Sequence, residues 1–207
     1  MSKVAIQGNA SGTGTFTIAA PNSNTDRTLT LPDEAGTVLT SASTISGLGS
    51  LTGVDSWYIT SAFVTSSSDS TQTLTANWSR FTGTNDSPAR IGSAMTQSSG
   101  VFTFPQTGMW LVVAQYALNP NGANSNYNYG SVAVSVDGGS NFTDSSFTWA
   151  NLDSARYTGI TSLYPVDVTD TSLVKVSFRV RSQQNIIVEG GSNEIRTGAF
   201  FIRLGDT

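Results

Sequence analysis

Carboxylates are the side chains in this sequence best suited to acid–base chemistry, because it contains no His and no Cys. Catalysis by carboxylates alone needs two of them close together, as in glycoside hydrolysis. The nearest pairs along the chain are Asp167 with Asp170 and Glu189 with Glu194. The run from Asp167 to Asp170 is more typical of a turn in which Asp side chains bond the backbone. We therefore predict that this protein is not an enzyme.

Two Gly-rich stretches match ligand-binding motifs only in part. The stretch Gly47–Gly53 has neither the spacing nor the strand–helix context of a dinucleotide-binding loop. The run Asp137-Gly-Gly-Ser-Asn141 offers oxygen atoms to Ca²⁺, but it has fewer carboxylates than a calcium loop and Asp-Gly favours a hairpin turn. We predict no cofactor and no metal.

Composition excludes several classes of partner. The net charge is −4, and the 10 Lys and Arg residues are scattered singly, so no basic stripe supports nucleic-acid binding. Charged residues make up only 12%, about half the usual share. The longest apolar run is too short to span a bilayer, and the first residues lack the apolar region of a signal peptide. We expect a protein that neither inserts into membranes nor carries a signal peptide.

The stretch Gly100–Leu118 is the densest in large apolar residues and predicts strand, turn, strand. Val101, Phe102 and Phe104 favour a half-buried pleated surface, and the turn lies between Pro105 and Gly108. From Met109 onward the run is uncharged and apolar on both faces. One face is expected to pack inside the molecule and the other against identical chains, because a monomeric sandwich leaves one face wet.

Short alternating segments elsewhere predict an all-β fold. From Asp55 onward, polar turns separate eight to ten strand-like runs, among them 56–64, 73–81, 131–139 and 172–180. This pattern is typical of a β-sandwich or jelly roll, and no convincing helix is present. Residues 119–130 read as a long polar loop with two tyrosines.

The chain is expected to have three parts: an extended, β-rich N-terminal arm at 1–40, a junction at 41–54 and a globular domain at 55–207. The arm has too few large apolar residues to bury a core alone. In the junction an apolar residue recurs at every third position from Ile45 to Val54. That spacing fits either a flexible Gly/Ser linker or an extended segment turning one apolar edge to a threefold axis.

The domain resembles the C1q/TNF-like jelly-roll family. The family pattern GxFxxPxxGxYxF is matched by Gly100, Phe102, Pro105 and Gly108, with Trp110 and Val112 in the alternating positions that follow. The alternating strand SVAVSVDGG and the final GAFFIRLGD also match, in order. The resemblance implies a jelly-roll β-sandwich that assembles as a homotrimer.

The arm resembles a different group, the bacteriophage tail-fibre and virion proteins. The runs GTFTIAAP and RTLTLPDEAGTV carry this resemblance. It implies a virion structural protein, attached to other virion proteins through residues 1–40. The location implied is a tail fibre or receptor-binding tip; the alternative is a capsid decoration (cement) or head-fibre trimer that stabilises the head shell. The predicted attachment residues are the apolar residues of the arm: Val4, Ile6, Phe16, Ile18, Leu29, Leu31, Val38 and Leu39.

Two further sets of residues are predicted as contact surfaces. The resemblance places the first, central and last strands at the trimer axis, with interface candidates Ile45, Leu48, Leu51, Trp57, Trp110, Val112, Tyr116, Phe178 and Phe201. The polar loop is the best candidate for binding a host-surface glycan or protein, through Asn119, Asn121, Asn126, Tyr127 and Tyr129, because Tyr and Asn combine contact area with adaptable hydrogen bonds. An ordinary solvated loop, or one touching a neighbouring subunit, is the alternative. For Phe147, Trp149 and Tyr157 core packing is the favoured role.

Overall fold

The computed structural model describes residues 11–15, 17, 22–26, 28, 51–66, 69–82 and 90–207. The chain divides into two compact units, Met1–Thr44 and Ile45–Thr207. All eight predicted attachment residues of the arm lie outside the described residues, as do Ile45 and Leu48 of the junction. Within the ranges just given, no helix is long and apolar enough to cross a membrane.

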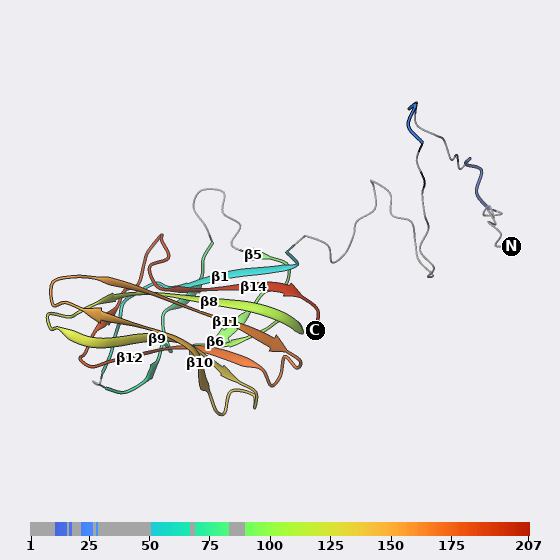
Figure 1. Ribbon diagram of the computed structural model, residues 1–207. Helices are drawn as coiled ribbons and strands as arrows, with labels where there is room; N and C mark the ends of the chain where they lie inside the picture. The colour runs from blue at the N-terminus through green and yellow to red at the C-terminus, as the bar shows by residue number, and fades with distance from the viewer. Residues whose placement is uncertain are drawn as a thin grey trace. The chain divides into compact units, whose positions relative to one another are not determined.

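The larger unit is a sandwich of two antiparallel sheets (Figure 1). In sheet A the order is β2-β13-β8-β14-β1-β4. Strands β13 and β14 pair with different parts of β8, β11 pairs with β8 as well, and β5 pairs with β1. In sheet B the order is β10-β9-β12-β7-β6, with β3 beside β12. The strands of sheet A are β1 (Gly53–Ile59), β2 (Phe63–Val64), β4 (Trp78–Arg80), β5 (Arg90–Ile91), β8 (Gly108–Asn119), β11 (Thr158–Val168), β13 (Ile187–Val188) and β14 (Gly198–Gly205). Those of sheet B are β3 (Gln72–Thr73), β6 (Thr96–Ser98), β7 (Val101–Thr103), β9 (Ser125–Ser135), β10 (Thr143–Leu152) and β12 (Lys175–Ser182).

This architecture confirms the predicted all-β jelly-roll sandwich. In Figure 1, β1, β14 and β8 form the upper layer, and β9, β12 and β10 the lower one. A hydrogen bond joins the two layers: Ser162 Oγ of β11 donates to the backbone carbonyl oxygen of Gly130 in β9 at 2.7 Å. The described residues contain no helix.

Strand β8 lies at the centre of sheet A, as the density of apolar residues in Gly100–Leu118 suggested. It pairs with β11 along its whole length on one side and with β14 on the other. Its residues alternate strictly between buried and half-buried from Gly108 to Asn119. The buried set includes Trp110, Val112 and Tyr116, so these three side chains point between the sheets.

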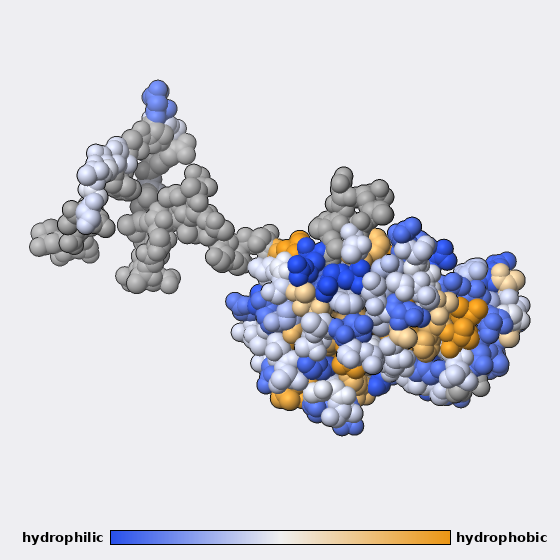
Figure 2. Space-filling model, turned by 180° about the vertical axis from the view of Figure 1, so that it is seen from behind, coloured by the Kyte–Doolittle hydropathy of each residue, from blue (hydrophilic) through white to orange (hydrophobic). Residues whose placement is uncertain are grey.

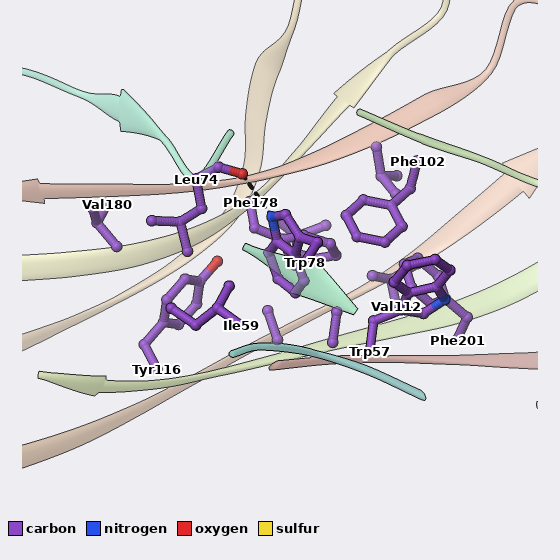
Figure 3. Packing of buried hydrophobic residues seen from close by; sticks show 14 of the residues in the cluster. Trp57, Ile59, Leu74, Trp78, Phe102, Val112, Tyr116, Phe178, Val180 and Phe201 are labelled. Carbon is purple, nitrogen blue, oxygen red and sulfur yellow. Dashed lines mark hydrogen bonds between the residues drawn. The ribbon is translucent and has the colours of Figure 1, made fainter. Parts of the chain in front are cut away.

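The core between the sheets is built around aromatic rings (Figure 3). Phe102 of β7 lies at its centre, with ring centroids 5.4 Å from Trp57, 5.0 Å from Trp78, 5.2 Å from Phe178 and 5.2 Å from Phe201. Most of these pairs are edge-to-face, the geometry that adds attraction beyond area burial. Trp78 Nε1 donates to the Leu74 carbonyl oxygen at 2.6 Å, which satisfies the indole inside the core.

Two glycines of the motif that carried the family resemblance are required by the backbone. Gly100 has φ +78° and Gly108 has φ +128°. A Cβ at Gly100 would overlap the Leu74 carbonyl oxygen, and one at Gly108 would overlap that of Gly205. The motif therefore marks two close backbone approaches, one just before β7 and one at the start of β8. These two strands do not pair with each other, because β7 belongs to sheet B and β8 to sheet A.

The structure corrects two sequence interpretations. The predicted single strand at 73–81 is two short strands on different sheets, β3 and β4, separated by Asn77 with φ +66°. The predicted polar loop at 119–130 is shorter than expected, because β9 begins at Ser125. Tyr127 and Tyr129 therefore lie on a strand of sheet B, where the pairing register and not loop flexibility sets their positions.

Candidate binding surfaces

Asp170, Glu189 and Glu194, three of the four candidate catalytic carboxylates, are held in structural contacts. Asp170 accepts hydrogen bonds from the backbone nitrogen of Ser172 at 2.7 Å and from its hydroxyl at 2.6 Å. These bonds lower the pKa of Asp170, the opposite of what a general acid needs. Asp167 is exposed on β11. The predicted turn at 167–170 therefore begins later than expected: Asp167 is still in β11, and Asp170 opens the turn to β12.

The pair Glu189 and Glu194 shares one guanidinium group. Arg196 Nε donates to Glu194 Oε1 at 2.8 Å, and its Nη1 lies 3.8 Å from Glu189 Oε2. The other Glu189 oxygen accepts a hydrogen bond from Asn119 Nδ2 at 2.8 Å. Both carboxylates thus face the single positive charge of Arg196, and Asn119 of the predicted surface loop serves to fix the end of β8.

Both carboxylate oxygens of Asp137 form hydrogen bonds with other residues of the same turn. Ser135 Oγ lies 2.6 Å from Asp137 Oδ1, which also accepts from the Asn141 backbone nitrogen at 2.9 Å, while Asn141 Nδ2 donates to Oδ2 at 2.7 Å. The hydrogen bond with Ser135, followed by those from Asn141, holds the pKa of Asp137 far below its usual value. Among the described residues, no three His, Cys, Asp or Glu side chains are grouped as a metal site requires.

Most of the predicted trimer-interface residues are in the wrong place for that role. The structure buries the following in the core between the sheets: Trp57, Trp110, Val112, Tyr116, Phe178 and Phe201. A side chain packed inside one sandwich cannot contact a sister chain, so these assignments are corrected. Leu51 is about half exposed (51%) just before β1.

The opposite face of sheet A carries the apolar residues that a neighbour could cover. Directly paired residues of neighbouring strands project from the same face of a sheet. Leu111 of β8 pairs with Pro165 of β11 and with Ile202 of β14, which in turn pairs with Val54 of β1. These four residues form one uncharged row across four strands.

A second row runs beside the first. Val113 of β8 pairs with Leu163 of β11 and with Phe200 of β14. Leu163 is 55% exposed, and the rest of both rows is half-buried or exposed on the outer side of the sheet. We call this set, with Met109, the apolar face of sheet A: Val54, Met109, Leu111, Val113, Leu163, Pro165, Phe200 and Ile202.

The apolar face of sheet A differs from ordinary protein surface because its apolar residues are direct pairing partners on neighbouring strands. In Figure 2, hydrophobic residues lie in separate patches among hydrophilic ones, as on most proteins. The sequence signalled one strand of the apolar face, because β8 is apolar at odd and even positions alike. Leu163 and Pro165 were missed, because only the strand order places them beside β8. On the last strand the prediction chose Phe201, which faces the core, and so missed Phe200 and Ile202 on the opposite face.

The predicted surface-loop residues separate into two groups. Asn121 lies in an exposed turn with φ +52°, and Asn126 is exposed at the start of β9. Tyr127 and Tyr129 project from the outer face of sheet B. There they meet Phe147 and Trp149 of the neighbouring strand β10, which are 50% and 51% exposed.

The expected core role of Phe147, Trp149 and Tyr157 is therefore wrong. Tyr157 is 69% exposed in the turn before β11. Phe147 and Trp149 pair with Ser131 and Tyr129, so they share the outer face of sheet B with Tyr129. The register shift between Asp144 and Ser146 determines which residues of β10 pair with β9. No pattern in the sequence predicted this shift.

Solved structures with similar folds belong to the TNF group. Murine APRIL at pH 5.0 superposes with a TM-score of 0.50 at 13% sequence identity, covering 73% of this chain and 98% of that one. Eiger TNF from S. frugiperda superposes with a TM-score of 0.51 at 12% identity, covering 74% and 93%. No protein-family model and no curated protein sequence matches the chain. The chain therefore contains a TNF-like jelly-roll domain, and at these identities the similarity is one of fold.

Proposed function

We propose that this chain is a non-enzymatic, homotrimeric structural protein of a bacteriophage virion. It forms a surface appendage, a tail fibre or receptor-binding tip, and joins the particle through residues 1–40. The apolar face of sheet A is the observation that carries the trimer. The tail-fibre-like runs in the arm support the virion role.

The apolar face is energetically costly to leave in water. Burying an exposed Leu, Val or Phe side chain fully contributes roughly 1.5–3 kcal/mol, so eight partly exposed residues supply a large driving force for association. Patches of this kind on soluble proteins mark interaction sites. Identical chains are the simplest occupant, because most soluble oligomers are closed and symmetric and TNF-like domains usually form homotrimers.

Light scattering coupled to size-exclusion chromatography tests the trimer. The full chain is expected at three times its mass of 21.7 kDa. The double variant Leu111→Glu/Phe200→Glu is expected at the single-chain mass with an unchanged far-ultraviolet circular dichroism spectrum, because both side chains project outward. Thr143→Glu, an exposed position on sheet B, is the matched control and stays trimeric. A wild-type mass of one chain at micromolar concentration would refute the trimer.

Incorporation into particles tests the arm. Phe16→Asp/Ile18→Asp in the full chain is expected to leave the trimer intact and to abolish its assembly onto virions. The control Ser11→Asp/Thr13→Asp changes the same charge in the same arm without removing an apolar residue, and it should assemble. Equal incorporation of both variants would contradict attachment through the apolar residues of the arm.

A capsid decoration or head-fibre trimer is the alternative location. It is favoured by the spread of the arm's apolar residues from Val4 to Leu39, since a shell surface can cover a long extended arm. Electron microscopy of the particle separates the two. A few to some tens of copies on the tail would exclude the decoration role, and hundreds of copies at threefold or quasi-threefold points of the head would exclude the fibre.

A further inference from the structure

Four aromatic side chains form a connected cluster on the outer face of sheet B. We call Tyr127, Tyr129, Phe147 and Trp149 the aromatic platform. Trp149 is in edge-to-face contact with Tyr129, with ring centroids 4.8 Å apart, with Phe147 at 5.8 Å, and with Tyr127 at 6.0 Å. The rings hold each other in fixed orientations while Phe147 and Trp149 each keep about half of their surface exposed.

Oriented polar groups surround the rings. The Tyr129 hydroxyl lies 2.7 Å from Thr71 Oγ1 and donates to Asp144 Oδ2 at 3.3 Å. Asp144 Oδ1 also accepts from Ser131 Oγ at 2.9 Å and lies 3.4 Å from Arg179 Nη1. The platform is therefore rigid at its base, because the one buried ring, Tyr129 at 6% exposure, is anchored at its hydroxyl.

A second carboxylate–guanidinium pair lies at the Tyr127 side. Arg181 Nη2 donates to Asp69 Oδ1 at 2.6 Å, and this pair is exposed. A hydrogen bond with Tyr127, followed by the one from Arg181, lowers the pKa of Asp69, so the carboxylate is ionised and oriented at neutral pH. The site thus combines exposed ring surfaces with donors and acceptors that are already positioned.

The position of the platform argues against a second copy as its occupant. The outer faces of the two sheets point in opposite directions, so assembly through the apolar face of sheet A leaves the platform uncovered. Its size argues against a protein partner. Two half-exposed aromatic side chains offer about 200 Å², whereas a stable protein interface buries about 800 Å² on each side.

The residues around the rings also differ in type from those at the centre of a protein–protein interface. Around the rings, the outer face of β9 and β12 carries Ser131, Arg179 and Arg181 and no Leu, Ile or Met. A sugar ring matches this combination, because its C–H face is apolar and packs on an aromatic ring while its hydroxyls need donors and acceptors at the rim. We propose that the aromatic platform binds a saccharide.

The biological role of this binding rests on the proposed function, because a virion appendage would meet saccharides on the surface of the host cell. The binding measurement itself needs only the purified full chain. The full chain is applied to an array of bacterial surface polysaccharides together with cellohexaose and tetra-N-acetylchitotetraose. Bound saccharides are then titrated by isothermal calorimetry. We expect at least one saccharide to bind and its affinity to fall at least tenfold in Phe147→Ser/Trp149→Ser.

Tyr157→Ser is the matched control, because it removes an aromatic ring that is more exposed than those of the platform and is not among the rings that contact one another there. It should bind as the wild type does. Trp149 fluorescence gives a second readout, since the other three tryptophans are buried in the core. Saccharide is expected to change the emission of the wild type and not that of Trp149→Phe.

Three outcomes would overturn the proposal: no saccharide bound by the folded wild type, equal binding by the Phe147/Trp149 variant, or equal loss in the Tyr157 variant. Capture of a periodate-treated envelope extract as efficient as that of the untreated extract would assign the platform to a protein partner and also overturn it. A trimer that assembles on virions but binds no saccharide would refute this inference alone. Saccharide binding by a protein absent from virions would refute only the proposed function.

Discussion

The outer faces of the two sheets differ in the types of residue that they carry. The apolar face of sheet A is aliphatic for the most part, uncharged along two rows, and spans four strands. The outer face of sheet B around β9, β10 and β12 carries polar and charged residues together with four contacting aromatic rings, and hydroxyl and carboxylate groups anchor these rings. The first suits a large dry contact with identical neighbours, and the second a small ligand with both apolar and polar surface.

The contrast shows that an exposed apolar residue must be interpreted together with the residues that pair with it on neighbouring strands. Leu163 and Trp149 are exposed to a similar extent, 55% and 51%. Leu163 continues a row of apolar residues on three strands, whereas Trp149 is bordered by hydrogen-bonded side chains. We therefore propose a subunit contact at Leu163 and a ligand contact at Trp149, although the two side chains are exposed to a similar extent.

Adjacent residues of β8 give the largest expected effect. Val112→Asp places a charge in the core, where Val112 is fully buried, and an unpaired buried charge costs more than a small domain can tolerate. We expect this variant to lose its folded circular dichroism spectrum. Val113→Asp projects from the apolar face and should give a folded protein at the single-chain mass. Loss of folding in both variants would show that the outer face belongs to the core of the domain.

Two phenylalanines separate core packing from surface packing. Phe102→Ala removes the ring that contacts four other aromatics and should lower the free energy of unfolding by about 3–5 kcal/mol. Phe147→Ala removes a half-exposed ring of the platform and should lower it by about 1 kcal/mol or less. Urea unfolding monitored by fluorescence measures both. Comparable losses would mean that the platform is part of the structural core.

Two Arg–Asp pairs extend the comparison to charge. Asp55 is 1% exposed and accepts from Arg80 Nε at 2.8 Å and from the Met95 backbone nitrogen at 2.9 Å. Arg80→Ala leaves this buried carboxylate without its cation and should cost about 3–5 kcal/mol in the same urea experiment. Arg181→Ala at the rim of the platform removes an exposed pair and should change stability little. A large loss at Arg181 would indicate that the rim holds sheet B together.

Sequence reasoning reached the fold because its signals are local. Alternation of apolar and polar residues, the Asp-Gly turn at Asp137 and the glycines at Gly100 and Gly108 each act through their own backbone, so they can be read without knowing the partners. The two-sheet sandwich follows from many such segments. The direction in which β8 turns each face is not local, and there the prediction placed Trp110, Val112 and Tyr116 on the wrong side.

The candidate surfaces depended on register, which the sequence hides. Tyr127 and Tyr129 were singled out as binding residues, and Phe147 and Trp149 as core residues. The β9–β10 pairing with its register shift brings all four onto one outer face. A one-residue slip would have sent Phe147 and Trp149 inward, since neighbouring residues of a strand face opposite sides. Pairing partners 20 residues apart carry no pattern that a single sequence displays.

Acid is expected to act on sheet B through the hairpin that carries the platform, and this is the smallest of the effects. Hydrogen bonds from Ser135 and Asn141 depress the pKa of Asp137 in the folded state. A group with a depressed pKa contributes stability that is complete above its unfolded pKa of about 3.9 and is lost as pH falls through the folded value. Thermal unfolding between pH 6 and pH 2 should show a midpoint that declines below about pH 4. The decline should be smaller in Asp137→Ala, which lacks this contribution at every pH. Parallel declines in the two proteins would place the acid sensitivity elsewhere.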